Sequence, residues 1–309
     1  MNEENVLSLQ ELCELAGVSR SGYYAWENAA ETRRKEEEQD QQDFAWIKDA
    51  YLFKGIHKGA KAIKMTLRRE YSMVMNLKKV KRLMKKYNLV CPLRQANPYR
   101  KMAKAQEPSE HAGNLVNRNF RRMARGVLLS DITYVYCGPD RFCVYLSTIK
   151  DAYTNEILSY EVSMSLEVDF VIRTVEKLYE VHGETLKNVI TLFHTDQGSH
   201  YISKSFKEII EDHGLIQSMS RRGNCWDNAP QESFFGHMKD EIKSALPLCR
   251  NFEQVKALIH YYMDYYNHHR CQWGLCHLTP AEYYEYSLTG ELPEMKLYEQ
   301  AMSFAKKED

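Results

Sequence analysis

Strand-forming and helix-forming segments follow one another in a definite order after Val127. Three runs rich in β-branched and aromatic residues, VLLSDITYVYC, FCVYLSTI and ILSYEVSM, are separated by the turn sequences GPDR and DAYTNE. Helical periodicity then covers 167–182, followed by an apolar strand (188–193), a helix (203–213), a strand (215–218) and two further helices. Three sequential strands followed by alternating helices and strands predict an α/β domain with a mixed five-stranded sheet.

The chain ahead of this domain is predicted to be helical. Residues 9–26 indicate two short helices around Gly17 and Val18, with Ser19 as an N-cap and an apolar face formed by Leu12, Leu15, Val18, Tyr23 and Trp26. This unit is either a helix-turn-helix or a simple packing element. Residues 29–43 contain no apolar residue larger than alanine, so we expect an exposed helical linker there.

Basic residues are concentrated in one block. The 309-residue chain has 42 basic and 42 acidic residues, yet Lys54–Lys104 contains 16 basic residues and a single acid, Glu70. Asn76 can cap a helix with an apolar stripe on one side and cations on the rest, namely Lys78, Lys79, Lys81, Arg82, Lys85 and Lys86. This pattern predicts a recognition helix in a DNA groove, the alternative being a solvated helix face. Cations grip phosphates and do not by themselves read sequence.

These patterns predict six segments: an HTH-like unit (1–30), a helical linker (31–53), a basic HTH-like DNA-binding domain (54–106), a linker (107–126), the α/β domain (127–290) and a tail (291–309). No apolar run approaches the ~18 residues of a membrane span, and the first residues do not resemble a secretory signal. We therefore expect a cytoplasmic protein, nucleoid-associated when bound to DNA. The cluster His268, His269, Cys271, Cys276 and His277 matches no standard zinc spacing and is interpreted as a packed helix end.

Three acids stand where metal ligands are expected in the α/β domain. Asp131 interrupts an apolar strand, Asp196 follows the strand that ends at Phe193, and Glu232 lies in the first turns of a helix with Pro230. Strand ends and helix starts meet at a crevice in an open α/β sheet. Converging carboxylates repel one another unless cations lie between them, and all-oxygen ligands suit Mg²⁺ or Mn²⁺. Two ions about 4 Å apart can activate a nucleophile at a phosphodiester.

The Glu232 helix has two distinguishable stripes. Phe235, Met238 and Ile242 should face the core, while Lys239 lies on the Glu232 side, seven residues being nearly two turns. Lys239 is a candidate DNA-phosphate contact, and a solvated lysine is the alternative.

The stretches LLSDITYV, HTDQGSHY and GNCWDNAPQESFFGHMKDE resemble the three catalytic blocks of the DDE integrase-core superfamily. They are similar in particular to the second-frame (OrfB-type) transposase of bacterial insertion sequences of the IS-three family. Asp196 and Glu232 are separated by 35 residues, the D,D-35-E spacing. SRSGYYAW, LKKVKRLMKKYNLV and YYNHHRCQWGLCHLTPAEYY also match, so the resemblance covers nearly the whole chain.

This resemblance implies a ribonuclease-H-like integrase core, dependence on Mg²⁺ or Mn²⁺ with two ions at Asp131, Asp196 and Glu232, and transfer of cleaved element ends to new DNA phosphates. The implied partners are double-stranded DNA of the terminal repeats and target, further copies of the chain on DNA, and an upstream-frame product joined by frameshifting. No leucine-zipper heptads are present, so the chain resembles the catalytic part alone. Leu128 and Ser130 stand where the family often has tryptophan and threonine, and both changes are compatible with packing.

Two other functions remain open at this point. One is a ribonuclease-H-fold nuclease that cuts without joining, and the other is a DNA-binding regulator with an inactive core. Strand-transfer products distinguish the first, and binding without metal-dependent cleavage distinguishes the second.

Several neighbouring residues have expected roles. Asp227 and Asn228 are expected to cap the Glu232 helix, with direct DNA contact as the alternative. His194, Gln197, Ser199 and His200 flank Asp196 and are candidates for substrate contact. Tyr261, Tyr262, Tyr265 and Tyr266 are expected to be core residues, and Asp151 is the substitute acid should Asp131 not belong to the site.

Overall fold

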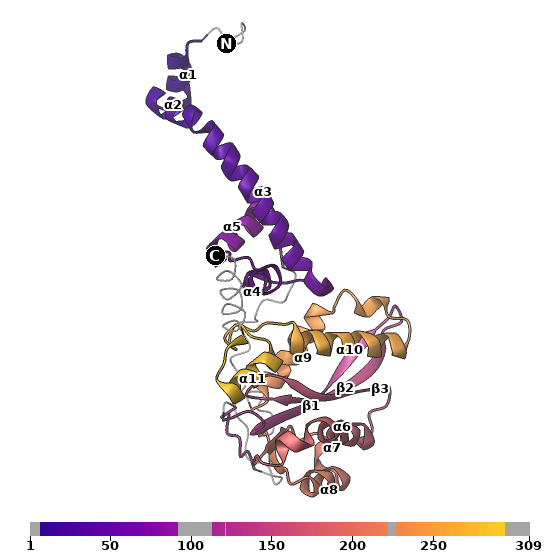
Figure 1. The fold of residues 1–309 in the computed structure, drawn as a ribbon. Helices are drawn as coiled ribbons and strands as arrows, with labels where there is room; N and C mark the ends of the chain where they lie inside the picture. Colours follow the sequence, from indigo (N-terminus) through magenta and orange to yellow (C-terminus); the bar gives the residue numbers. More distant parts are fainter. Residues whose placement is uncertain (1–6, 92–112, 121, 222–226, 294–309) are drawn as a thin grey trace, which may run out of the picture. The chain divides into compact units, whose positions relative to one another are not determined.

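The computed structural model describes residues 7–91, 113–120, 122–221 and 227–293. The chain divides into two compact units, one comprising Met1–Phe53 and Lys58–Cys91, the other Lys54–His57 and Pro92–Asp309 (Figure 1). Residues 92–106 of the expected DNA-binding domain, 107–112 of the expected linker and nearly all of the expected tail lie outside the described residues. Among the described helices, none is long and apolar enough to cross a membrane.

The first unit is helical, as predicted. Its helices are α1 (Leu9–Ala16), α2 (Arg20–Asn28), α3 (Ala30–Leu52), α4 (Ala60–Tyr71) and α5 (Leu77–Lys86), with a 3₁₀ turn η1 (Phe53–Gly55) after α3. Gly17 ends α1 in the left-handed conformation at φ 68°, a geometry that favours glycine. Ser19 caps α2 by accepting a hydrogen bond from Gly22 N, and Asn76 caps α5 by accepting one from Lys78 N, which confirms both predicted caps.

The expected apolar face of the first two helices is not a core, which corrects that prediction. Leu15, Val18 and Trp26 are 76%, 52% and 62% exposed, and Cys13 is the buried residue of α1. Two helices of eight and nine residues have too little surface to enclose these side chains. Arg33 from α3 instead lies over the Trp26 ring, 4.1 Å from its centroid.

A hydrophobic cluster joins α3, α4 and α5. Its fully buried members come from all three helices and are Ile47, Ala50, Ile63, Leu67, Val80 and Leu83. The exposed helix expected over 29–43 therefore continues into the packed part of α3. Asp40 and Asp43 are also buried within that stretch, contrary to the expected exposure, because cations of α5 pair with them.

The second unit is built on a five-stranded sheet, as predicted. Its strands are β1 (Val127–Cys137), β2 (Phe142–Asp151), β3 (Ile157–Ser163), β4 (Leu192–Thr195) and β5 (Ile216–Met219). The order is β3-β2-β1-β4-β5, with β1, β2 and β3 antiparallel and β4 parallel to both β1 and β5. The sheet is therefore mixed. Because β1 and β4 are neighbours, Asp131 on β1 lies beside the end of β4, which Asp196 follows.

Helices cover the two faces of this sheet (Figure 1). One face carries α6 (Val168–Leu186), α7 (Ser199–Ile202) and α8 (Lys204–Asp212), and the other carries α9 (Ala229–Glu241), α10 (Phe252–His268) and α11 (Pro280–Thr289), with a 3₁₀ turn η3 (Leu246–Leu248) after α9. Alternate β1 residues serve the two layers: Leu128 packs with α6 and α8, whereas Val135 packs with α9 and α10.

Two boundaries differ from those expected from the sequence. β4 begins at Leu192, not residue 188, because α6 continues to Leu186. Between them, the Thr191 hydroxyl donates a hydrogen bond of 2.9 Å to the Arg125 carbonyl. Part of the expected linker 107–126 packs on the core: Val116 is fully buried in a cluster with Val127, and Arg125 pairs with Asp151. Both differences come from contacts between segments distant in sequence.

Candidate active site

Asp131 lies on the face of β1 that α9 covers. Alternation along the strand places it with Thr133 and Val135, opposite Thr148 of β2. Its Oδ1 accepts a hydrogen bond from Ile132 N at 2.8 Å, and its Oδ2 accepts one from Asn228 Nδ2 at 3.1 Å. The carboxylate is therefore held both by its own strand and by the residue that precedes α9.

Asp196 and Glu232 are positioned by local backbone geometry. Asp196 follows β4, and its Oδ1 accepts a hydrogen bond from Gly198 N at 2.9 Å. A Cβ at position 198 would lie 2.9 Å from that same oxygen, so a side chain there would displace the Asp196 carboxylate. Glu232 is in the first turn of α9, where its backbone N–H donates to Asn228 O at 3.2 Å. Pro230 occupies an early helical position at which a missing N–H costs nothing.

The three acids influence one another electrostatically. Burial, together with the negative charges of Asp196 and Glu232, raises the pKa of Asp131 to about 7. Burial and the charges of Asp131 and Asp196 likewise raise the pKa of Tyr201, whose hydroxyl lies 3.3 Å from Ser130 Oγ. Side chains from β1, the β4 end and α9 therefore converge.

The chemistry of this donor set fits a hard divalent cation, since it consists of carboxylate oxygens and one nearby amide. Within the described part of the chain, no group of three His, Cys, Asp or Glu side chains is yet arranged as a metal-binding cluster. Asn228 Oδ1 beside Asp131 is buried and has no hydrogen-bond partner among these residues. The acids are thus close enough to repel but are not drawn together into a coordination shell.

Two hydrogen bonds connect the start of α9 to β2. Lys150 Nζ donates to Pro230 O at 3.0 Å, and Gln231 Nε2 donates to the Thr148 hydroxyl. Burial lowers the pKa of Lys150 to about 7. The predicted core stripe of α9 is confirmed, because Phe235, Met238 and Ile242 are all buried. Lys239 is half-buried, and burial lowers its pKa while the nearby Asp131 charge opposes that shift.

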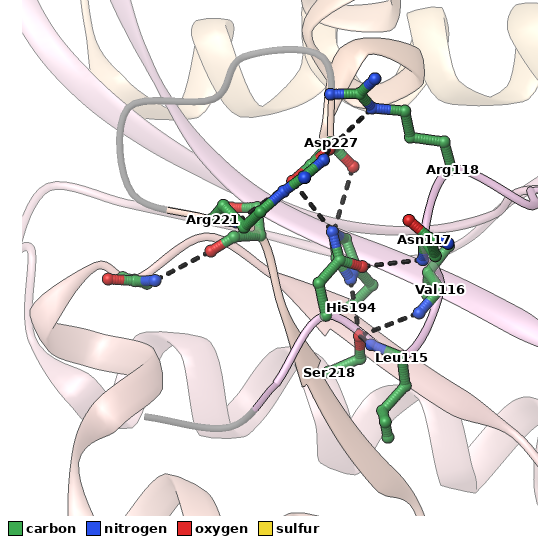
Figure 2. A network of polar contacts seen from close by, with 11 residues as sticks. Leu115, Val116, Asn117, Arg118, His194, Ser218, Arg221 and Asp227 are labelled. Atoms are coloured by element: carbon green, nitrogen blue, oxygen red, sulfur yellow. Dashed lines mark hydrogen bonds and ion pairs between the residues drawn. The ribbon is translucent and has the colours of Figure 1, made fainter. Parts of the chain in front are cut away.

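Asp227 is the centre of a polar network that the sequence did not indicate (Figure 2). Its carboxylate, 1% exposed, accepts hydrogen bonds of 2.9 Å each from Asn114 Nδ2, Arg118 Nε, Arg221 Nε and Arg221 Nη2. Burial alone would raise the pKa of Asp227, but these donors hold it well below its ordinary value. Neither Asp227 nor Asn228 caps α9 with its side chain, so the expected capping role is wrong.

His194 links this network to the sheet. Its Nε2 lies 3.1 Å from Asp227 O, an acceptor, so Nε2 carries the proton and donates. Nδ1 then accepts from Ser218 Oγ at 3.0 Å, and the same hydroxyl oxygen accepts from Leu115 N at 3.0 Å (Figure 2). Burial lowers the pKa of His194 to about 4. His194 is therefore a neutral buried link, and the expected substrate contact is wrong for it.

Comparison with known proteins decides the family. The insertion element IS600 uncharacterized 31 kDa protein of Shigella sonnei is 31% identical over 275 residues, which cover 89% of this chain and 97% of that protein. An uncharacterized transposase-like protein of Haemophilus influenzae is 33% identical over 72% of this chain and its own full length. The putative transposase InsK for insertion sequence element IS150 of Escherichia coli is 31% identical over 73% of this chain and 76% of its own. The chain belongs to the insertion-sequence transposases.

Family models divide this transposase as its fold does. Models described as Integrase core domain match residues 121–225 and 232–288, and one described as HTH-like domain matches 38–97. The transposase is thus a DDE polynucleotidyl transferase with an integrase core and a DNA-binding HTH-like region. The HTLV-2 integrase catalytic core domain, solved in complex with magnesium, overlaps 53% of this chain and 99% of its own, with 14% identity and a TM-score of 0.41.

The other residues around Asp196 in the transposase have structural partners. Gln197 Nε2 donates to Ser220 O at 2.9 Å, and His200 Nε2 lies 3.2 Å from Leu166 O, whereas Ser199 is exposed. Asp151, the substitute acid, is fully buried and accepts hydrogen bonds from the Arg125 guanidinium and backbone, Tyr153 N and Thr154 Oγ1. These contacts make Asp151 a structural residue.

The tyrosines of α10 are core residues, with one exception. Tyr262, Tyr265 and Tyr266 are buried, and Tyr262 donates its hydroxyl to Glu241 Oε2 at 2.9 Å. Tyr261 is 45% exposed and donates to Lys54 O at 3.0 Å. The His and Cys cluster predicted as a packed helix end lies where α10 ends, at His268. His268 Nδ1 lies 3.1 Å from Asp264 Oδ1. The His277 ring packs on the Trp273 ring, with 4.4 Å between their centroids.

The six cations of α5 fall into two sets of three. Lys79, Arg82 and Lys86 pair with acids of α3: Lys79 with Asp43, Arg82 with Asp40 at 2.7 Å, and Lys86 with Glu37 and Asp40 at 2.5 and 2.8 Å. Lys78, Lys81 and Lys85 are exposed, and no residue that the structure describes pairs with them. At 100° per residue, Lys78, Arg82 and Lys85 all lie opposite the buried stripe of α5, so the two sets differ in their partners and not in their helix face. The predicted DNA-binding set is therefore not uniform, because three of its members hold α3.

Proposed function

We propose that Asp131, Asp196 and Glu232 of this transposase hold two divalent cations, Mg²⁺ or Mn²⁺, for strand cleavage and strand transfer at the ends of its insertion sequence. The observation that supports this most directly is the hydrogen bond of 3.1 Å by which Asn228, at the start of the Glu232 helix, holds Asp131 Oδ2, and the raised pKa of Asp131, to about 7, agrees with it. A buried carboxylate among like charges is stabilised when cations neutralise them. Bound cations supply activation of water or a 3′-hydroxyl and stabilise the leaving oxygen.

The chain's own residues have defined tasks in this reaction. Asn228 and Ile132 hold the Asp131 carboxylate in one orientation, and Gly198 fixes Asp196. Positioned groups of this kind reduce the entropy that must be lost in the transition state. We assign to Lys239, which is half-buried near Asp131, the task of holding a backbone phosphate of the DNA against the site. The buried network around Asp227 keeps the start of α9, and therefore Glu232, in place.

DNA is gripped elsewhere, in this proposal, by the exposed lysines of α5. Lys78, Lys81 and Lys85 are spaced i, i+3 and i+7, so they are neighbours on one side of α5, and all three are exposed. Lysines placed in this way contact phosphates and give affinity without base recognition. Lys79, Arg82 and Lys86 hold α5 against α3 and are assigned that structural task instead.

The chemistry is tested with the purified chain and a labelled duplex that carries its own element's terminus, in Mg²⁺, Mn²⁺ or EDTA. We expect metal-dependent nicking at the terminus and joined products. Nicking that never yields joined products supports a nuclease and contradicts strand transfer. Binding with no metal-dependent cleavage, even after addition of the fused upstream-frame product, contradicts the proposed function and supports a regulator with an inactive core. Sedimentation on the same duplex tests assembly of several copies.

A further inference from the structure

Asn228 stands where a helix-capping asparagine is expected, yet its side chain binds Asp131 instead of the helix backbone. It precedes α9 without making a capping hydrogen bond. Its Nδ2 instead donates to Asp131 Oδ2 at 3.1 Å, while Asp131 Oδ1 accepts from Ile132 N at 2.8 Å. Both oxygens of Asp131 are therefore oriented, one by β1 and one by the residue that begins the helix of Glu232.

The other end of the Asn228 amide is unsatisfied. Asn228 is 5% exposed, and its Oδ1 is buried without a hydrogen-bond partner among the described residues. Leaving such a buried atom unpaired is destabilising. Turning the amide over would break the bond from Nδ2 to Asp131 Oδ2, and an Asp131 ionised to ligate a cation has no proton to donate to Oδ1. The amide orientation is thus decided by Asp131, and Oδ1 lacks a donor.

The surroundings hold Asn228 in this orientation from both sides. The preceding residue, Asp227, is fixed by Arg118 and Arg221, and its carbonyl accepts from His194. On the following side, Lys150 donates to Pro230 O. These contacts fix the backbone on either side of Asn228, and the burial of its side chain leaves the amide little room to turn. An orphaned acceptor kept at a fixed place beside a catalytic carboxylate suggests a ligand that completes it.

We propose that Asn228 is a positioning residue for the cation site of this transposase. Its Nδ2 sets the orientation of Asp131, and its Oδ1 accepts a hydrogen bond from the hydration shell of a divalent cation held by that carboxylate. A hydrated cation supplies a positive charge that neutralises the Asp131 carboxylate and a water molecule that donates a hydrogen bond to Oδ1. Ligating carboxylates are commonly oriented by such outer partners. The inference rests on the proposed function, because it requires a cation at Asp131.

The test measures binding of Mn²⁺ alone to the full chain, without DNA, from the loss of the free-ion electron paramagnetic resonance signal. We expect Asn228→Ala to weaken Mn²⁺ binding by about 10- to 100-fold, the range seen when an outer partner of a metal ligand is removed. Asn228→Asp keeps the side-chain shape but sets a second carboxylate against Asp131. Its metal-free form should melt below the unsubstituted chain, and Mn²⁺ should raise its melting temperature by more.

Asn251→Ala is the matched control. Asn251 is also an asparagine that precedes a helix, α10, but it makes a true cap by accepting from Gln254 N at 3.0 Å. Its loss should lower the melting temperature and leave Mn²⁺ affinity unchanged. A parallel effect of Asn251→Ala and Asn228→Ala on Mn²⁺ binding would assign the Asn228 effect to general destabilisation and overturn the inference.

Two results separate this inference from the function beneath it. If Asp131→Asn abolishes Mn²⁺ binding while Asn228→Ala binds Mn²⁺ as tightly as the unsubstituted chain, Asn228 has no role toward the cation and the proposed function still stands. If the unsubstituted chain does not bind Mn²⁺ at millimolar concentration, the cation site itself is contradicted, and the inference is overturned with it.

Discussion

Arg82 of α5 donates two hydrogen bonds of 2.7 Å each to the two carboxylate oxygens of Asp40 on α3. Lys86 adds a third bond to Asp40, and these donors, Arg82 first, hold the pKa of Asp40 well below its ordinary value. The bidentate geometry is the strong form of an arginine–carboxylate pair. Part of the positive charge of α5 therefore holds the helices together, and the remainder is exposed.

Two triple variants that remove equal charge should behave differently. Replacing Lys78, Lys81 and Lys85 with glutamine should weaken DNA binding and reduce the slope of log affinity against log salt by about 0.9 for each DNA phosphate that a lysine no longer neutralises. The melting temperature should stay near that of the unsubstituted chain, because no described residue pairs with these lysines. Fluorescence anisotropy over a salt series measures the slope.

The matched variant replaces Lys79, Arg82 and Lys86 with glutamine. Removal of their pairs with Asp40, Asp43 and Glu37 should lower the melting temperature of the helical unit, with a smaller change in salt slope for the fraction that remains folded. Equal salt slopes in the two variants would contradict the division of the α5 cations into an exposed set and a set that pairs with α3.

Substitution of a carboxylate at the candidate site should abolish chemistry while sparing binding. Asp131→Asn, Asp196→Asn and Glu232→Gln are each expected to reduce strand cleavage by at least about 10³-fold, roughly 4 kcal/mol of barrier. The same duplex should be bound with unchanged affinity in EDTA. Near-normal cleavage by any one of the three would remove that residue from the site.

Asp227→Ala should destabilise the catalytic unit. It leaves Arg118, Arg221 and Asn114 without their shared acceptor, and we expect a loss on the order of 2 kcal/mol, since the arginines remain partly exposed to water. Asp227→Asn keeps an acceptor oxygen and should lose less. Urea unfolding gives both values, and Asp212→Ala, at an exposed helix end, is expected to change stability by less than about 0.5 kcal/mol.

His194 should make stability depend on acid pH. Its pKa is about 4 in the folded chain against 6.5 for the unperturbed group, so the unfolded chain binds a proton in this interval and the folded chain does not. The free energy of unfolding should therefore fall as pH decreases from about 6.5 to 4, by up to about 3 kcal/mol. His194→Gln should show a shallower fall. An identical pH profile in the variant would mean that His194 is charged when folded.

Metal binding should release a proton from Asp131. With a pKa of about 7 before the cation binds, Asp131 is largely protonated at pH 6 and must ionise to become a ligand. Mn²⁺ affinity should thus rise between pH 6 and pH 7 and level off above it. Calorimetry at pH 6 in two buffers of different ionisation enthalpy measures the proton released. Equal heats in both buffers would argue against a raised Asp131 pKa.

Features that depend on neighbours along the chain were predictable. Period-two and helical patterns indicated the mixed sheet and its helices, and the caps at Ser19 and Asn76 follow from residues two or three positions away. The buried stripe of Phe235, Met238 and Ile242 follows from helical spacing alone. Boundaries were less predictable: α6 runs on to Leu186, whose buried side chain belongs to the cluster that also contains Phe193 and Ile210.

The pairing of polar residues emerged only from the folded chain. Asp227 is a residue type typical of helix caps, but in the fold its carboxylate accepts a hydrogen bond from Asn114, 113 positions away. Arg82 and Lys81 are adjacent cations that no local pattern separates, yet Arg82 pairs with Asp40 and Lys81 is exposed. Local patterns were enough to establish the order of elements and the placement of Asp131 within a strand, Asp196 just after a strand and Glu232 at a helix start. Which side chains meet depends on helices and strands packing across long sequence separations, and local patterns do not encode that.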